Sequence, residues 1–89
     1  MAQRTMTEPD FVGTLRAVLK RKLTGAQVEV EQIRGQRYRF SVVWDRFDRM
    51  GHPERQERVW AIAESALEPG DLLNVGMILT LGRKDLPAR

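Results

Sequence analysis

The stretch RYRFSVVW, residues 37–44, decides the fold, because large apolar and polar side chains alternate along it. A period of two is typical of a strand with one buried and one exposed face. The buried face is predicted to carry Tyr38, Phe40, Val42 and Trp44, and the other face Arg37, Arg39, Ser41 and Val43. Residues 26–33 alternate in the same way, and the turn Arg34-Gly35-Gln36 separates the two runs. The two runs therefore predict an antiparallel hairpin.

Segments with helical spacing lie on both sides of this hairpin. Phe11, Leu15 and Leu19 predict a first helix over about residues 8–23, with Gly25 as its left-handed stop. Pro53 opens a second helix, because proline is favoured in the first helical turn. The buried stripe of this second helix is predicted to consist of Val59, Ile62, Ala63, Ala66 and Leu67, with Trp60 beside it.

Two further segments complete the predicted order of elements. Residues 45–52 are expected to be a polar loop that Phe47 and Met50 anchor. Residues 74–81 are expected to form the last strand. Its alternation places Leu73, Val75, Met77, Leu79 and Leu81 on one face, and Asn74, Gly76, Ile78 and Thr80 on the other.

These elements predict an α+β fold in the order helix, strand, strand, helix, strand. A helix that joins two strands normally makes them parallel. We therefore expect a three-stranded mixed sheet with both helices on one face. The expected organisation is a flexible N-terminus over residues 1–7, one domain over residues 8–82 and a charged tail over residues 83–89.

Composition limits the function. The 89 residues include 15 Lys and Arg against 12 Asp and Glu, for a net charge of +3, so an acidic partner is plausible. There is no cysteine, which excludes disulfides and thiolate chemistry on this chain. No apolar run is long enough to span a membrane. With no secretory signal in view, we expect a cytoplasmic protein that does not bind membranes.

Residues that could carry catalysis are few. His52 is the only histidine, and a metal site needs several converging ligands. Asp45 and Asp48 alternate with Arg46 and Arg49, so we expect solvated or paired carboxylates. No phosphate-binding loop or nucleotide fingerprint occurs. We therefore predict no enzyme activity, no cofactor and no metal; a small enzyme or metal protein centred on His52 is the least favoured alternative.

The middle of the chain resembles the BolA family. The segment SVVWDRF, residues 41–47, matches that family's Val-rich strand end followed by Asp and Phe. Arg55 stands eight residues after Phe47, where the family has an Arg-His-Arg triplet, and Val59-Trp60 replaces its Val-Tyr pair. The resemblance covers about residues 8–82 and implies the same order of elements. It also implies a likeness to one class of KH domain, although no Gly-x-x-Gly loop for RNA occurs here.

The departures from the family concern its metal ligands. In the family, His and Cys side chains help to hold an iron–sulfur cluster shared with a monothiol glutaredoxin. Here Gln56 and Glu57 replace the His and Arg of the triplet, Asn74 or a neighbour replaces a His before the last strand, and residues 34–36 contain neither His nor Cys. The resemblance therefore implies the fold without the cluster.

Together these observations predict a non-enzymatic BolA-like interaction or regulatory domain with an unidentified protein partner. The expected working surface is the outer sheet face together with residues 45–52. The predicted contact residues are Arg37, Arg39, Arg46, Arg49 and Arg55. The alternative is a module that binds RNA or DNA through the same arginines. Homodimerisation through the sheet edges is a further expectation.

Overall fold

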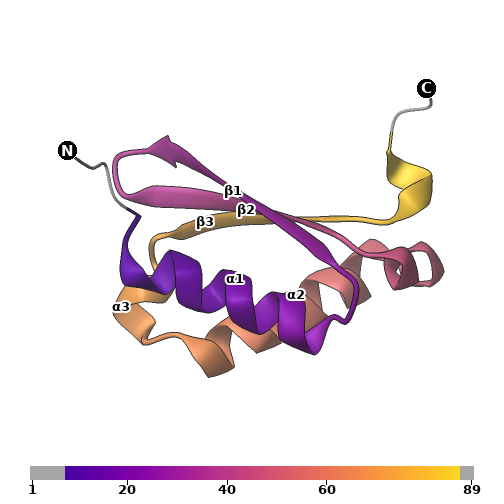
Figure 1. The fold of residues 1–89 in the computed structure, drawn as a ribbon, viewed down its shortest axis with the longest axis horizontal. Helices are drawn as coiled ribbons and strands as arrows, with labels where there is room; N and C mark the ends of the chain where they lie inside the picture. Colours follow the sequence, from indigo (N-terminus) through magenta and orange to yellow (C-terminus); the bar gives the residue numbers. More distant parts are fainter. Residues whose placement is uncertain (1–7, 87–89) are drawn as a thin grey trace.

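The computed structural model describes residues 8–86, which form a three-stranded sheet with helices packed under it (Figure 1). The elements in chain order are α1 (Asp10–Lys22), β1 (Gln27–Arg34), β2 (Arg37–Val43), the 3-10 helix η1 (Asp45–Arg49), α2 (His52–Ala66), α3 (Pro69–Leu72), β3 (Val75–Leu81) and the 3-10 helix η2 (Arg83–Asp85). The predicted α+β class and order of main elements are confirmed.

The sheet has the order β1-β2-β3, so β2 is its central strand. β1 and β2 are antiparallel, and Gly35 in the turn between them has a φ of +58°, a conformation that glycine adopts without steric cost. β2 and β3 are parallel, as the intervening helix predicts. The mixed sheet is therefore confirmed.

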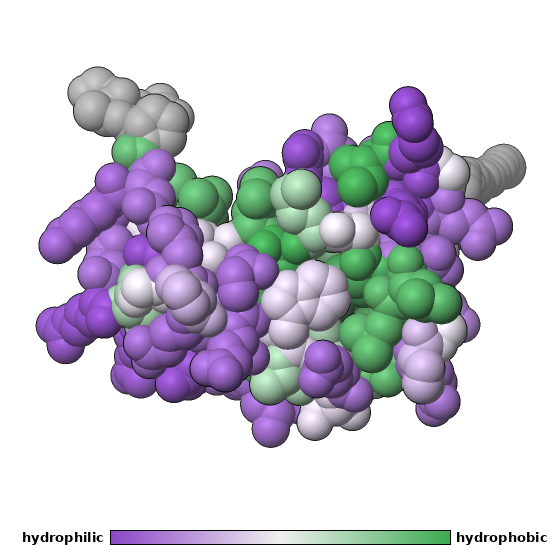
Figure 2. Space-filling view, turned by 180° about the vertical axis from the view of Figure 1, so that it is seen from behind, coloured by the Kyte–Doolittle hydropathy of each residue, from purple (hydrophilic) through white to green (hydrophobic). Residues whose placement is uncertain are grey.

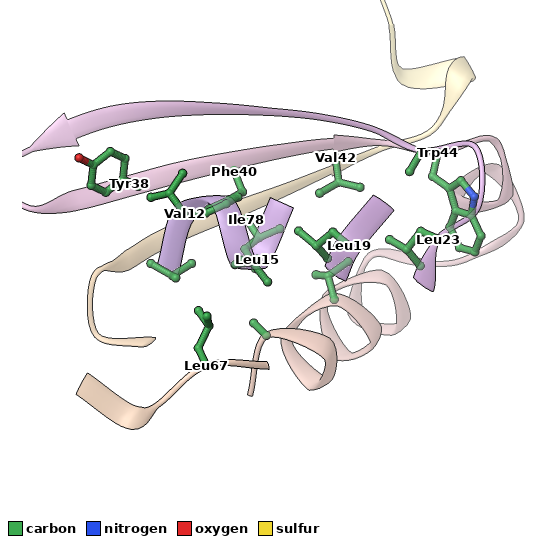
Figure 3. Close-up of a cluster of buried hydrophobic side chains, with 14 of the residues drawn as sticks. Val12, Leu15, Leu19, Leu23, Tyr38, Phe40, Val42, Trp44, Leu67 and Ile78 are labelled. Atoms are coloured by element: carbon green, nitrogen blue, oxygen red, sulfur yellow. The ribbon is translucent and has the colours of Figure 1, made fainter. Parts of the chain in front are cut away.

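The core lies between the sheet and the two long helices (Figure 3). From α1, Val12, Leu15 and Leu19 are completely buried, and Phe40 and Val42 of β2 meet them. At one end of this core, Trp44 donates from Nε1 to the carbonyl oxygen of Thr24 at 2.9 Å. This hydrogen bond ties the segment after α1 to the end of β2, and Gly25 has the positive φ, +89°, predicted for it.

Residues 45–49 form η1, so the prediction of a loop over residues 45–52 is wrong there. The reason is Phe47, which is completely buried and stands edge-on to Trp44 with the ring centroids 5.3 Å apart. To bring Phe47 inward, the chain winds tightly. The Phe47 N–H donates to the Trp44 carbonyl, and the Met50 N–H donates to the Phe47 carbonyl, both at 3.0 Å.

The prediction for the faces of β3 is wrong at Val75, which lies on the face of Ile78 and Thr80 and not on that of Met77 and Leu79. Tyr38 lies opposite Val75, but Arg39 lies opposite Met77, so Gly76 is an extra residue that shifts the register. Because side chains alternate along a strand, one extra residue moves all later side chains to the opposite face. Val75, Ile78 and Thr80 are consequently buried, whereas Met77 and Leu79 are exposed.

The segment predicted as a charged tail from residue 83 begins as η2, which packs beside η1. Arg83 donates to Asp45 at 2.6 Å, and the Lys84 N–H donates to the Asp48 carboxylate at 3.0 Å. One ion pair and one backbone hydrogen bond therefore connect residues 83 and 84 to η1. Residues 1–7 and 87–89, which belong to the predicted flexible start and tail, lie outside the described residues.

Candidate interaction surface

The outer face of the sheet, opposite the helices, carries two of the five predicted arginines. Arg37 and Arg39 follow the predicted alternation of β2 and point away from the core. Arg39 forms an ion pair with Glu31, its cross-strand neighbour on β1. Within residues 8–86, Arg37 has no carboxylate partner and is exposed. Of these two arginines, Arg37 is therefore free and Arg39 is already neutralised.

Exposed hydrophobic side chains lie on the same face. The shift at Gly76 places Met77 and Leu79 there, with exposed fractions of 45% and 36%. Ile33 joins them, because its side chain reaches over Gly76, where even a methyl group would lie only 3.1 Å from the Ile33 Cδ1 atom. The result is an apolar stripe of Ile33, Met77 and Leu79 beside Arg37 and Arg39.

A hollow of about 320 Å³ continues this stripe toward the end of the sheet. Its lining residues are Gln27, Glu29, Ser41, Val43, Leu81 and Leu86. Leu86 extends from the end of η2 and is itself exposed. Seen from behind, the molecule shows hydrophobic side chains gathered mainly in the right half of the view, which is the α3 end of the domain, and a largely hydrophilic left half (Figure 2). The hollow lies toward the opposite end, beside η2.

Arg46 and Arg49 lie away from this stripe. Both are exposed on η1, and the Arg46 guanidinium stands 5.6 Å from the centre of the Trp44 ring, in a cation–π arrangement. η1 follows the last residue of β2, whereas Arg37 is the first residue of that strand. A strand of seven residues separates them by roughly 20 Å. The structure therefore does not bring the predicted arginines together into one patch.

Arg55 is buried, which removes it from the predicted contact surface. Only 6% of the residue is exposed. Its guanidinium donates to the carbonyl oxygens of Met50 (3.0 Å) and Thr80 (3.1 Å) and to the carboxylate of Asp85 (2.7 Å). It also stands 5.8 Å from the centre of the Phe47 ring. Arg55 therefore joins the start of α2, the end of β3 and η2 from within.

The electrostatic result of this arrangement appears at Asp85. The hydrogen bond from the Gly82 N–H, followed by that from Arg55, holds the pKa of the Asp85 carboxyl below its ordinary value. A sequence signal for the burial of Arg55 does exist. Arg55, Val59 and Ala63 recur every four residues, so Arg55 occupies the buried stripe of α2.

The described part of the chain assembles no cluster of metal ligands around its histidine. His52 is exposed at the first residue of α2. Among residues 8–86, no three His, Cys, Asp or Glu side chains converge as metal ligands. No helix in the same range is long and apolar enough to cross a membrane. On the sheet, the surface features that could bind a partner are the apolar stripe, its arginine border and the edge of β1.

Comparison with known proteins agrees with this geometry at the level of the fold. No family model matches the sequence, and no curated protein matches it. Among solved structures, BolA1 from Arabidopsis thaliana superimposes with a TM-score of 0.68. The fold is BolA-like. The match covers 89% of this chain and 99% of BolA1 at 13% sequence identity, so the BolA-like fold is shared over almost the whole domain.

Proposed function

We propose that this chain is a non-enzymatic BolA-like interaction domain, and that the outer face of its sheet binds a protein partner. The observation that carries the proposal is the sequence of β3, VGMILTL, which is apolar on both faces. Parallel strands with such runs are normally covered on both sides. Here the helices cover Val75 and Ile78, while Met77 and Leu79 remain exposed.

The border of this surface supports a protein partner. Interfaces between proteins commonly have an apolar centre, are enriched in Met and Arg, and are polar at the rim. Ile33, Met77 and Leu79 would supply the centre, and Arg37 and Arg39 the border. The hollow beside Leu81 and Leu86 adds a recess that one partner side chain could fill.

The residues present do not fit the iron–sulfur cluster that the BolA family shares with a monothiol glutaredoxin. Such clusters are held by Cys thiolates and, in some proteins, by His. The chain has no Cys, and its one His lies at the exposed start of α2. Gln56, at the position of a family His, is engaged with the edge of β3 through a bond to the Ile78 carbonyl. The proposed interaction therefore involves no shared cluster.

Nucleic-acid binding through the same face is less well supported. Phosphates favour clusters of unpaired cations. Glu29 and Glu31 lie on the outer face of β1, and Glu31 already neutralises Arg39. Arg46 and Arg49 lie at the other end of the sheet. A cytoplasmic location remains a prediction.

Site-specific photo-crosslinking in the native cell tests the proposal. A photoreactive residue at Leu79 should capture a discrete protein, whereas one at Glu64, exposed on α2, should not. Replacing Met77 by Lys should abolish the capture at Leu79. Identical background adducts at both positions would overturn the proposal. Salt-sensitive RNA or DNA binding that is lost in Arg37→Ala with Arg39→Ala would instead assign the face to nucleic acid.

A further inference from the structure

The two edges of the sheet differ in whether side chains cover their backbone groups. At the β3 edge, side chains of α2 engage the backbone: Gln56 donates to the Ile78 carbonyl at 2.9 Å, and Arg55 donates to the Thr80 carbonyl at 3.1 Å. Trp60 holds Gln56 in place through a hydrogen bond of 3.0 Å from its indole nitrogen. Another strand would have to displace these side chains, so the β3 edge is protected.

The β1 edge has no such cover. The N–H groups of Tyr38 and Trp44 donate to the segment that includes β3, so the even-numbered residues of β2 point their backbone groups toward β3. Val28 and Val30 lie opposite even-numbered residues of β2. Their own N–H and C=O groups therefore point away from β2, toward the free edge of β1 (Figure 1).

The side chains along β1 indicate which kind of strand would fit at its free edge. No residue of this eight-residue strand is buried. Val28 and Val30 are only half-buried against the core on the helix side, so an added strand could cover them further. On the outer side, Glu29 and Glu31 form an acidic row; Glu31 pairs with Arg39, and Glu29 has no cationic partner within residues 8–86. The edge is apolar on one side and acidic on the other.

We propose that the free edge of β1 binds an extended segment of a partner protein as a fourth strand. The alternate side chains of that segment are apolar, against Val28 and Val30, and basic, beside Glu29 and Glu31. Backbone hydrogen bonds supply the attachment, and the charges on the outer side select the sequence. The free edge of β1 is separated by β2 from Met77 and Leu79 of the apolar stripe, so either proposal can hold without the other.

A second copy of the chain fits the edge less well. In an antiparallel pair of β1 strands, either register that places Val30 opposite a valine of the second copy also places Glu29 opposite a glutamate, Glu29 or Glu31, of that copy. Like charges directly opposite one another destabilise a strand pair. The acidic row therefore disfavours the homodimer and favours a basic strand.

The test uses a capped heptapeptide, Lys-Val-Lys-Val-Lys-Val-Lys, and amide hydrogen exchange of the full chain measured by NMR. Binding should slow the exchange of the Val28 and Val30 N–H groups at least tenfold and leave the Ile78 N–H unchanged. Val30→Pro should weaken binding at least tenfold, because it removes the central edge donor without breaking a hydrogen bond to β2. Leu79→Lys is the matched control, and it should leave peptide binding intact.

Charge reversal makes the test specific. The peptide Glu-Val-Glu-Val-Glu-Val-Glu should bind the wild-type chain at least tenfold more weakly, and Glu29→Lys should narrow or invert this preference. The proposal is overturned if saturating peptide gives no protection at Val28 and Val30, or if both peptides bind equally. Protection of β1 amides that rises with protein concentration in the absence of peptide would assign the edge to a second copy. Loss of binding in Leu79→Lys would place the peptide on the outer face instead.

Discussion

Replacing Arg55 by Ala tests the most connected side chain in the domain. The substitution removes donors to the Met50 and Thr80 carbonyls and to the Asp85 carboxylate. A hydrogen bond involving a charged group contributes about 1.5–3 kcal/mol, and a buried group left without its partner costs about 1–3 kcal/mol. The Asp85 side chain is 32% exposed, so the loss of its ion pair with Arg55 contributes least to the change in the free energy of unfolding.

The expected loss is therefore about 3–5 kcal/mol, dominated by the buried Thr80 carbonyl and by the lost cation–π contact of the Arg55 guanidinium with the Phe47 ring. A chain of 89 residues has a free energy of unfolding of about 4–13 kcal/mol, at about 0.05–0.15 kcal/mol per residue. Arg55→Ala thus removes a large share of the stability. Arg55→Met keeps an apolar stem and should lose less.

Urea unfolding followed by circular dichroism measures these differences. Arg58→Ala is the matched control, because Arg58 is exposed on the same helix and should change the free energy by less than about 0.5 kcal/mol. If Arg55→Ala lost less than about 1 kcal/mol, or no more than Arg58→Ala, the reasoning from its buried hydrogen bonds would be refuted.

Three further predictions concern neighbouring contacts. Gly82→Ala should cost about 1–3 kcal/mol in urea unfolding, because the added Cβ would lie 2.9 Å from the Asp48 backbone nitrogen; unchanged stability would contradict this close approach. The pKa of Asp85 is lowered in the folded chain, so its stabilisation is complete above its ordinary pKa near 3.8 and is lost as the pH falls through the folded value. Asp85→Asn should flatten this acid limb of a stability-against-pH profile, and an unaltered limb would exclude Asp85 as its source. Trp44→Phe should lose about 1 kcal/mol or more in thermal unfolding, because the hydrogen bond to Thr24 disappears; an unchanged melting temperature would argue against it.

The order and pairing of the main elements could be predicted because each has a strong local pattern. β2 alternates without interruption, and its predicted inner residues Tyr38, Phe40, Val42 and Trp44 are all buried. η1 could not be predicted in the same way. A single buried aromatic, Phe47, sets the path of η1. One apolar residue cannot form a repeating pattern, so the sequence carries no periodic signal for this element.

The candidate surface was less predictable, because it depends on contacts between distant segments. Arg55 looks like a surface residue by type, and only the position of Thr80 and Asp85 around it makes its burial favourable. The apolar stripe depends on a register shift that the alternation of residues 74–81 does not reveal. Arg37 and Arg39 were placed correctly on the outer face, because they share the period of the strand that decides the fold.

The extra residue at Gly76 gives β3 a place where the chain can change length without turning its faces. Val75 pairs with Tyr38 and Met77 pairs with Arg39, so Gly76 has no partner in the register. Deleting Gly76 would bring Val75 and Met77 into regular alternation, with Met77 and Leu79 still outward and Ile78 and Thr80 still toward the helices. Relatives that lack this residue would therefore present the same side chains of β3 to their partners.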